Sequence, residues 1–183
     1  MRIVVDTSVA RAAGEGDHTA RACLDSLETM VRIKSYTAVF NRSLLKEWFR
    51  VLEDKAGKKR THASSFAVDW FRKMRKKVQV LPGQHQRSRV QVFRERRHFI
   101  NYCLQASSQL AVSAIEKDLH LVDLALQADQ RVLSTDKKIV GHLRRLGARV
   151  PQVCPILWVH PVNHDAPTWL AGGAPARDDC RIC

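Results

Sequence analysis

Several features are missing from this chain of 183 residues, and each absence argues against a class of protein. No apolar run approaches the roughly 20 residues that a helix needs to span a bilayer, and Arg2 with the short apolar stretch after it does not resemble a signal peptide. The Gly-x-Ser-x-Gly elbow of serine hydrolases and a glycine-rich phosphate loop are also missing. We therefore expect a cytoplasmic protein with no membrane span and no Ser-His-Asp chemistry.

Acidic residues are scarce. The chain has 18 Asp and Glu residues against 31 Lys and Arg residues, which gives a formal net charge of +13. A surface of this kind attracts polyanions with an affinity that falls as salt is added. Nucleic acid is the leading partner class, and an anionic membrane surface is the alternative. The apolar content of 45% is sufficient for the core of one domain.

The cysteines are odd in number and scattered, unlike the disulfide framework of a small secreted domain, so we expect reduced thiols. They are Cys23, Cys103, Cys154, Cys180 and Cys183. The last two form a C-x-x-C pair, but no second ligand pair lies near it and the histidines are dispersed, which argues against a zinc site. Pro, Gly, Ala and Asp dominate residues 161–183, which predicts a C-terminal tail with a frayed end.

Short apolar runs alternate with segments of helical periodicity along the rest of the chain. The runs that read as strands are 2–5, 32–35, 78–81, 132–134 and 150–158. Helical spacing of apolar residues occurs in 20–31, 44–52, 66–74 and 139–146, and two helical patterns run together in 107–128. Asn41 or Ser43 can cap the helix at 44–52. Helices that alternate with short buried strands predict an α/β fold with a parallel sheet.

Four acidic residues fall where these strands end or where the helices could face the same edge. Asp6 follows the first strand and Asp136 the fourth, while Glu47 and Asp118 lie on predicted helices, with Asp118 near the start of its helix. In an open parallel sheet the functional crevice lies beyond the carboxyl ends of the strands. Clustered carboxylates repel one another unless a cation relieves them, so the set predicts a Mg²⁺ or Mn²⁺ site that activates water against a phosphodiester.

Each of these acids also has an ordinary explanation. Asp6 could be only a helix N-cap, and Asp136 could be a turn residue. Asp118 could be a first-turn acid favoured by the helix dipole, and Glu47 could be a solvated helix acid. The metal-site interpretation is favoured because all four acids are expected at the same edge of the sheet.

Four segments together resemble those of the PIN-domain family. The resemblance covers roughly residues 1–160. The segments are 3–9 (IVVDTSV), 45–48 (LKEW), 117–126 (KDLHLVDLAL) and 132–136 (VLSTD). The resemblance implies a three-layer α/β/α sandwich with a central parallel sheet of four to five strands, and metal-dependent cleavage of RNA, often as the toxin of a toxin–antitoxin pair. It matches Asp6, Glu47, Asp118 and Asp136 to the metal ligands, and Ser8 or Thr7 to the hydroxyl beside the first acid.

Basic residues outside these motifs are expected to hold the RNA backbone. The candidates are Lys58, Lys59, Arg60, Arg87, Arg89, Arg94, Arg96 and Arg97. The last five belong to a basic insertion at about 84–98, in which Phe93 could stack on bases. Docking of an acidic antitoxin, or a contact with the acidic crevice, is the alternative role of this insertion.

The sequence therefore predicts a PIN-like endoribonuclease domain at 1–160, followed by the tail at 161–183. The resemblance also implies a homodimer and a protein antitoxin. Two alternatives stay open, namely a catalytically inactive PIN-like nucleic-acid-binding module and a structure-specific DNA nuclease. A phosphatase with an aspartyl nucleophile is disfavoured, because Ser8 stands where its second Asp would be.

Overall fold

The computed structural model describes residues 1–52, 65–74, 77–81, 109–147 and 151–183. Its centre is a parallel sheet of five strands in the order β3-β2-β1-β4-β5. The strands are β1 (Arg2–Val5), β2 (Thr37–Phe40), β3 (Gln79–Val80), β4 (Arg131–Leu133) and β5 (Leu157–Val159). The parallel α/β sheet that the sequence predicts is confirmed.

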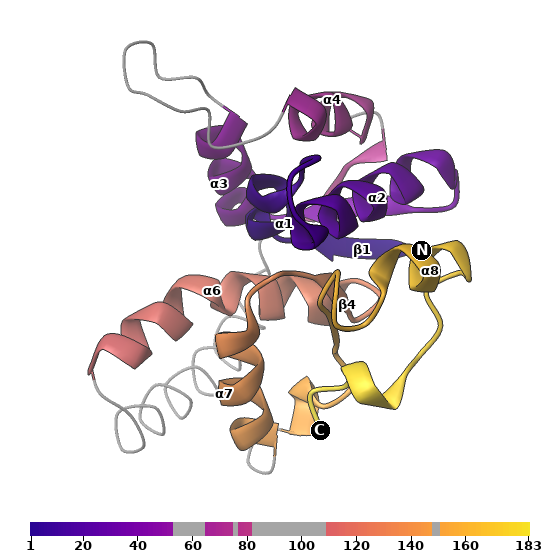
Figure 1. Ribbon diagram of the computed structural model, residues 1–183. Helices are drawn as coiled ribbons and strands as arrows, with labels where there is room; N and C mark the ends of the chain where they lie inside the picture. Colours follow the sequence, from indigo (N-terminus) through magenta and orange to yellow (C-terminus); the bar gives the residue numbers. More distant parts are fainter. Residues whose placement is uncertain (53–64, 75–76, 82–108, 148–150) are drawn as a thin grey trace.

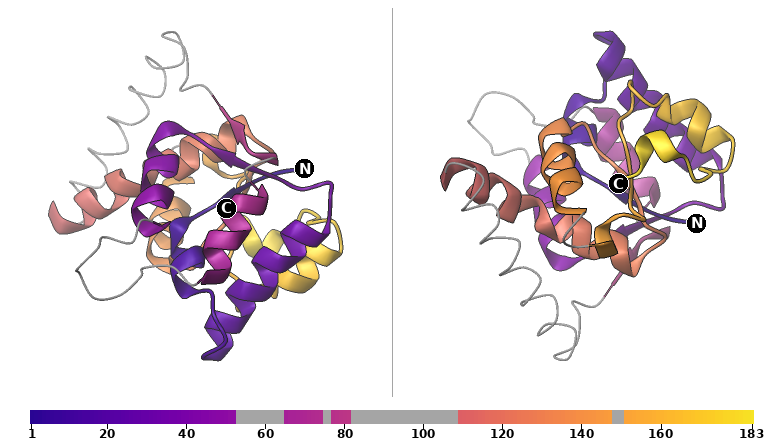
Figure 2. Two further views of the ribbon diagram at one scale, coloured as in Figure 1. Left: turned by 90° about the horizontal axis from the view of Figure 1, so that it is seen from above. Right: turned by 90° about the horizontal axis from the view of Figure 1, so that it is seen from below.

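Helices cover both faces of this sheet. They are α1 (Thr7–Ala12), α2 (His18–Arg32), α3 (Arg42–Leu52), α4 (Ser65–Met74), α6 (Gln109–Gln127), α7 (Lys137–Gly147) and α8 (Ala166–Ala171). Helices α1 to α4 lie on one side of β1, and α6 and α7 lie on the other (Figure 1). Views from above and below show the two helical layers in turn (Figure 2), which confirms the three-layer α/β/α sandwich. Of the helices in the described ranges, none is both long and apolar enough to cross a membrane.

The strands are apolar on both faces, as a sheet covered by two helical layers requires. Ile3, Val4 and Val5 of β1 are completely buried, as are Val39 of β2 and Val132 of β4. A strand buried on both faces shows a continuous apolar run instead of an alternating one. This is why the sequence of β1 could be interpreted correctly without any knowledge of its neighbours.

An aromatic cluster attaches α3 and α4 to the sheet. The ring centroid of Trp48 lies 5.0 Å from that of Trp70, 5.5 Å from that of Phe71 and 5.9 Å from that of Phe40. Aromatic pairs at such distances contribute about 0.5–1.5 kcal/mol each beyond the area that they bury. The cluster therefore fixes α3 against β2, and with it the residue next to Trp48, which is Glu47.

Two strands differ from the sequence-based expectation. The run 32–35 does not form a strand, because α2 continues to Arg32 and the N–H of Ile33 still donates to the carbonyl of Thr29. The strand at this place is β2, which begins at Thr37. Of the segment 150–158, Pro151–Val153 forms a 3-10 turn and only the end belongs to β5.

The C-terminal segment is packed against the domain, so the expectation of a tail with a frayed end is wrong for it. Helix α8 packs against α2, and Trp169 and Leu170 of α8 are buried. Ile182 is completely buried, and its N–H donates to the carbonyl of Ile156 at 3.1 Å. The segment contains three large apolar side chains, and their burial outweighs the conformational entropy lost when the chain around them is ordered.

The cysteines also differ in part from the expectation. Cys154 and Cys183, which are 29 residues apart, form a disulfide, so the expectation of reduced thiols is wrong for this pair. Cys23 and Cys180 are free and buried, and burial raises the pKa of Cys23 to about 12 and that of Cys180 to about 11. Both free thiols are therefore protonated and unreactive at neutral pH. Cys103 lies outside the described residues.

Candidate functional site

The strand order creates a switch point between β1 and β4. The chain runs from β1 to β2 and β3 on one side, and then places β4 and β5 on the other side of β1. Ligand sites of open α/β sheets lie beyond the carboxyl ends of the two strands at such a point. Asp6 follows β1 directly and its N–H donates to the carbonyl of Leu133, the last residue of β4, at 3.0 Å. Asp136 follows three residues after Leu133.

A hollow of about 210 Å³ lies at this point and collects all four predicted acids. It is lined by Asp6, Thr7, Ser8, Arg11, Glu47, Arg50, Asp118 and Asp136. The acids come from four places in the sequence, namely the end of β1, α3, α6 and the residue before α7. Residues separated by up to 130 positions in the chain are thus brought to one small cavity, as the sequence-based hypothesis requires.

Asp6 is almost fully buried and both of its carboxylate oxygens accept hydrogen bonds. Oδ2 accepts from the hydroxyls of Ser8 at 2.5 Å and Ser134 at 2.7 Å. Oδ1 accepts from the N–H of Ser8 at 3.3 Å and the hydroxyl of Thr7 at 3.4 Å. These four hydrogen bonds fix the orientation of the buried carboxylate. Asp6 also caps α1, so its ordinary explanation as an N-cap is correct and does not compete with a role in the hollow.

Ser134 connects two of the acids. It is completely buried, its hydroxyl donates to Asp6, and the same oxygen accepts the N–H of Asp136 at 3.0 Å. Ser8 adds a second connection, because its hydroxyl oxygen accepts the N–H of Thr135 at 3.1 Å. The two serines therefore hold the ends of β1 and β4 in register. Sequence reasoning assigned no role to Ser134, although its position at the end of a strand, two residues before an acid, was a usable signal.

Asp136 caps α7 with one oxygen. Oδ1 accepts the N–H groups of Lys138 at 2.8 Å and Ile139 at 3.5 Å. Within the described part of the chain, Oδ2 accepts no hydrogen bond. The carboxylate is half-buried and lines the hollow, so its second oxygen is available to a ligand.

Glu47 is held by the packing of its neighbour on α3. The indole N–H of Trp48 donates to the carbonyl of Val5 at 2.9 Å, which places α3 over the end of β1. Oε2 of Glu47 lies 3.7 Å from Nε2 of His120 on α6. The contact joins the two helices that contribute the second and third acids.

Asp118 lies in the middle of α6, so the expectation that it stands near a helix start is wrong, and the first-turn explanation does not apply. Two helical patterns follow one another in 107–128, and the second was taken as a new helix beginning near Asp118. The structure has one helix across both patterns. Asn41 fixes α6 relative to α3. Its amide donates to the carbonyl of His120 at 3.1 Å, and its Oδ1 accepts the N–H of Leu44 at 2.8 Å as the predicted cap.

The lining of the hollow offers carboxylate and hydroxyl oxygens, which are the ligands that Mg²⁺ and Mn²⁺ prefer. Among the described residues, no three His, Cys, Asp or Glu side chains are close enough together to hold a metal ion. The donor chemistry therefore fits a hard divalent cation, but the four carboxylates do not close into a cage around one ion. Mg²⁺ does not need such a cage, because it usually keeps several waters and uses one or two carboxylates with phosphate oxygens.

The predicted RNA-binding residues lie outside the described part of the chain. They are Lys58, Lys59, Arg60, Arg87, Arg89, Arg94, Arg96 and Arg97. The two arginines that do line the hollow, Arg11 and Arg50, were not selected from the sequence. Nothing in their local sequence distinguishes them from the other exposed arginines, because only the packing of α1 on α3 brings them together.

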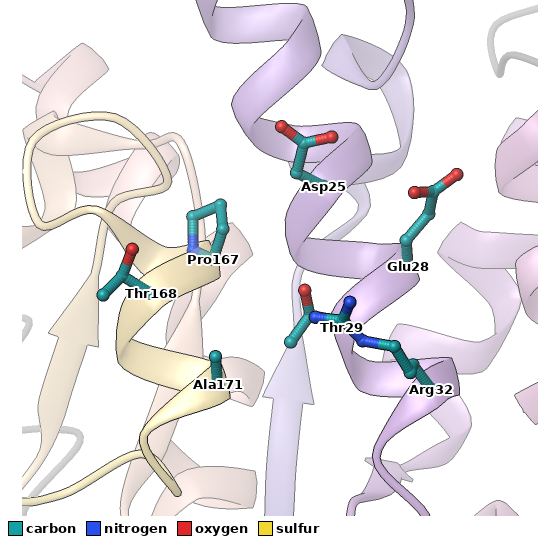
Figure 3. Close-up of a pocket in the computed structure, with 7 residues that line it drawn as sticks. All are labelled: Asp25, Glu28, Thr29, Arg32, Pro167, Thr168 and Ala171. Atoms are coloured by element: carbon teal, nitrogen blue, oxygen red, sulfur yellow. The ribbon is translucent and has the colours of Figure 1, made fainter.

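A second, larger hollow of about 510 Å³ lies between α2 and α8. Figure 3 shows its lining, which combines Asp25, Glu28, Thr29 and Arg32 of α2 with three residues of α8. None of the predicted site residues lines it. Its mixed charges do not indicate one ligand class, so the acidic hollow at the switch point is the candidate site.

Comparison with known proteins adds no further constraint. No family model matches the chain, and no curated protein and no solved structure is similar enough to count as a match. The resemblance to PIN domains therefore stays a prediction from the four sequence segments, and the functional argument depends on the geometry of the hollow.

Proposed function

We propose that this protein is a Mg²⁺- or Mn²⁺-dependent endoribonuclease of the PIN type. The observation that carries the proposal is the gathering of Asp6, Glu47, Asp118 and Asp136 in one hollow at the β1/β4 switch point. Two of these acids, Glu47 and Asp118, lie within helices and cap neither of them. A capping role therefore does not explain why four carboxylates meet there.

The electrostatics of the hollow favour a cation and a polyanion together. Four carboxylates line the hollow, whereas the chain as a whole carries a net charge of +13. A bound Mg²⁺ or Mn²⁺ supplies an activated water and offsets the charge that develops on a phosphodiester. RNA is the preferred substrate by resemblance, and the basic surface favours its backbone over neutral ligands.

The residues of the site have separable roles in this proposal. Ser8 and Ser134 orient Asp6, because their hydroxyls donate to its Oδ2. Asp136 offers Oδ2 to the cation while its Oδ1 stays on the helix N-terminus. Glu47 and Asp118 complete the lining from α3 and α6. A toxin-like role with a protein antitoxin, and a homodimer, belong to the proposal through the resemblance alone.

A second candidate is a PIN-like module that binds nucleic acid without cleaving it. The observation that favours it is the spacing of the acids, which do not form a three-ligand metal group among the described residues. The caps that Asp6 and Asp136 make would be retained in such a module for stability. A DNA nuclease would share the same carboxylates and differ only in substrate.

The test is to incubate wild type, Asp118→Asn and Asp25→Asn proteins with mixed total RNA in Mn²⁺, Mg²⁺ or chelator, and to sequence the cut ends. Asp25 is an exposed acid outside the acidic hollow, so Asp25→Asn controls for the loss of one negative charge. Discrete cuts that need metal, persist in Asp25→Asn and disappear in Asp118→Asn are expected. Undiminished RNA binding without cuts in all three proteins would favour the binding module, and preferential cleavage of a competing DNA would favour the DNA nuclease.

A further inference from the structure

Two arginines share the acidic hollow with the four carboxylates. Arg11 lies three residues after Ser8 on α1, and Arg50 lies three residues after Glu47 on α3. Residues three apart in a helix lie on the same face, so each guanidinium extends from the face that carries a site residue. Both arginines are exposed, and α1 packs against α3. The two cations therefore lie at the solvent side of the hollow, with the buried Asp6 deeper.

Neither guanidinium is bound directly to one of the acids of the hollow. In the described part of the chain, neither Arg11 nor Arg50 forms an ion pair, whereas five other pairs are present. An exposed arginine that lines an acidic hollow without pairing keeps its hydrogen-bond donors available to a ligand. Its planar fork of donors matches the oxygens of a phosphate group and can bind two of them at once.

The charge of the hollow explains why such cations are needed. Four ionised carboxylates with one divalent cation leave two negative charges, which would repel an approaching phosphodiester. Two guanidinium groups at the rim offset this excess. Lysines and arginines elsewhere on the surface attract RNA at long range, but they do not compensate the charge at the place where the backbone must come closest.

We propose that Arg11 and Arg50 form a phosphate clamp, which binds the RNA phosphates next to the one that is cut and draws the backbone over the acids. The clamp rests on the proposed ribonuclease function and specifies how its substrate is held. It binds the substrate and the transition state alike, so it acts mainly on KM. The substrate it fits is a single strand, whose backbone can bend into a small hollow.

The experiment compares Arg11→Gln, Arg50→Gln and the double variant with Arg21→Gln. Arg21 is an exposed arginine of α2 that lines neither hollow, so it is the charge-matched control. Affinity for a short single-stranded RNA of mixed sequence is measured at several salt concentrations, in an Asp118→Asn background with Mg²⁺ so that the RNA stays intact. Cleavage of the same RNA is measured with Asp118 present, and thermal unfolding is followed for every variant.

The slope of log affinity against log salt should fall by about 0.7 for each arginine removed, because each phosphate contact on a single strand contributes about that amount. KM should rise roughly tenfold for each removal, while kcat stays near the wild-type value. Arg21→Gln should change neither quantity. Thermal stability should fall only slightly, because Arg11, Arg50 and Arg21 make no ion pair among the described residues and lose at most a favourable charge near a helix end.

Salt slopes and KM values equal to those of Arg21→Gln would overturn the clamp, and the ribonuclease proposal would still stand if the wild type cleaved RNA. Loss of thermal stability in Arg11→Gln and Arg50→Gln without a change of slope would overturn it too, and would assign both arginines to shielding of the acids. If the wild type cleaves no RNA in any divalent metal, the proposed function fails, and the slopes still decide whether Arg11 and Arg50 bind phosphate.

Discussion

Replacing Ser134 by alanine should cost stability and activity together, because one hydroxyl serves two acids. Its hydrogen bond to the Asp6 carboxylate is charge-assisted and worth about 1.5–3 kcal/mol, and the bond that it accepts from Asp136 N–H is worth about 1 kcal/mol. The loss of stability is reduced because Oδ2 of Asp6 keeps its bond from Ser8 and because water can reach the half-buried Asp136. We expect Ser134→Ala to lower the free energy of unfolding by about 2–3 kcal/mol.

Urea denaturation followed by tryptophan fluorescence measures this change, since Trp48, Trp70 and Trp158 are buried. With a typical m value near 2 kcal/mol/M, the midpoint should fall by about 1 M. Ser26→Ala is the matched control, because Ser26 is also completely buried and its hydroxyl only donates to the carbonyl of Ala22 in its own helix. That change should stay within about 0.5 kcal/mol, since alanine is the better helix former.

RNA cleavage by Ser134→Ala is the second readout of the same variant. Loss of a residue that orients a metal-binding group typically costs 10- to 100-fold in activity. Equal midpoints for Ser134→Ala and Ser26→Ala would refute the energetic reasoning. A fully active Ser134→Ala protein would show that the site does not depend on the connection between the two acids.

Three further predictions concern stability. Reduction of the Cys154–Cys183 disulfide, or Cys183→Ser, should lower the free energy of unfolding by about 3.5 kcal/mol, because the bridge closes a loop across 29 residues, and a urea midpoint insensitive to reductant would contradict this. Burial holds the pKa of His160 below its ordinary 6.5, and its Nδ1 accepts two backbone N–H groups. As the pH drops below 6.5, the unfolded chain takes up the proton before the folded chain does, so the free energy of unfolding should fall. The fall should be less steep in His160→Asn, whose Oδ1 can accept the same two hydrogen bonds but does not titrate. Parallel curves of stability against pH for the two proteins would contradict this prediction. Tyr36→Phe should cost about 1 kcal/mol through loss of the bond to the carbonyl of Leu170, measured by the same denaturation, and no change would show that this bond is not needed to hold α8.

Much of the fold follows from apolar patterning alone. β1 carries a continuous apolar run, residues 3–5, directly before Asp6, and such a run is typical of a strand in the middle of a covered parallel sheet. The second strand was misplaced because the residues after α2 carry no clear signal of where the helix ends, and only pairing with β1 decides that the strand begins at Thr37. The segment 161–183 was expected to be a tail because it is rich in glycine and proline. Composition does not show that single side chains such as Trp169 and Ile182 are buried against the domain.

Some residues of the candidate site could also be predicted from the sequence, whereas others could not. Acids at strand ends could be selected from the sequence, because the carboxyl ends of parallel strands share one edge. Ser134 and the two arginines could not, because their importance depends on which residues lie opposite them in space. The disulfide partner of Cys183 could not be chosen from the sequence either, since the pairing requires β5 to lie beside the chain end.

Metal-dependent cleavage of RNA by the acids of the hollow can be tested by a titration with Mn²⁺. The initial rate of cleavage of a defined RNA is followed as Mn²⁺ is increased, for wild type, Glu47→Gln and the control Asp25→Asn. Glu47 is the informative residue, because it has no capping role and Gln preserves its size. We predict a rate that rises and saturates with Mn²⁺ and is unchanged in Asp25→Asn. In Glu47→Gln the rate should fall at least tenfold, about the smallest loss expected when a metal-site residue is altered. A rate that ignores Mn²⁺, or a Glu47→Gln protein as active as wild type, would contradict it.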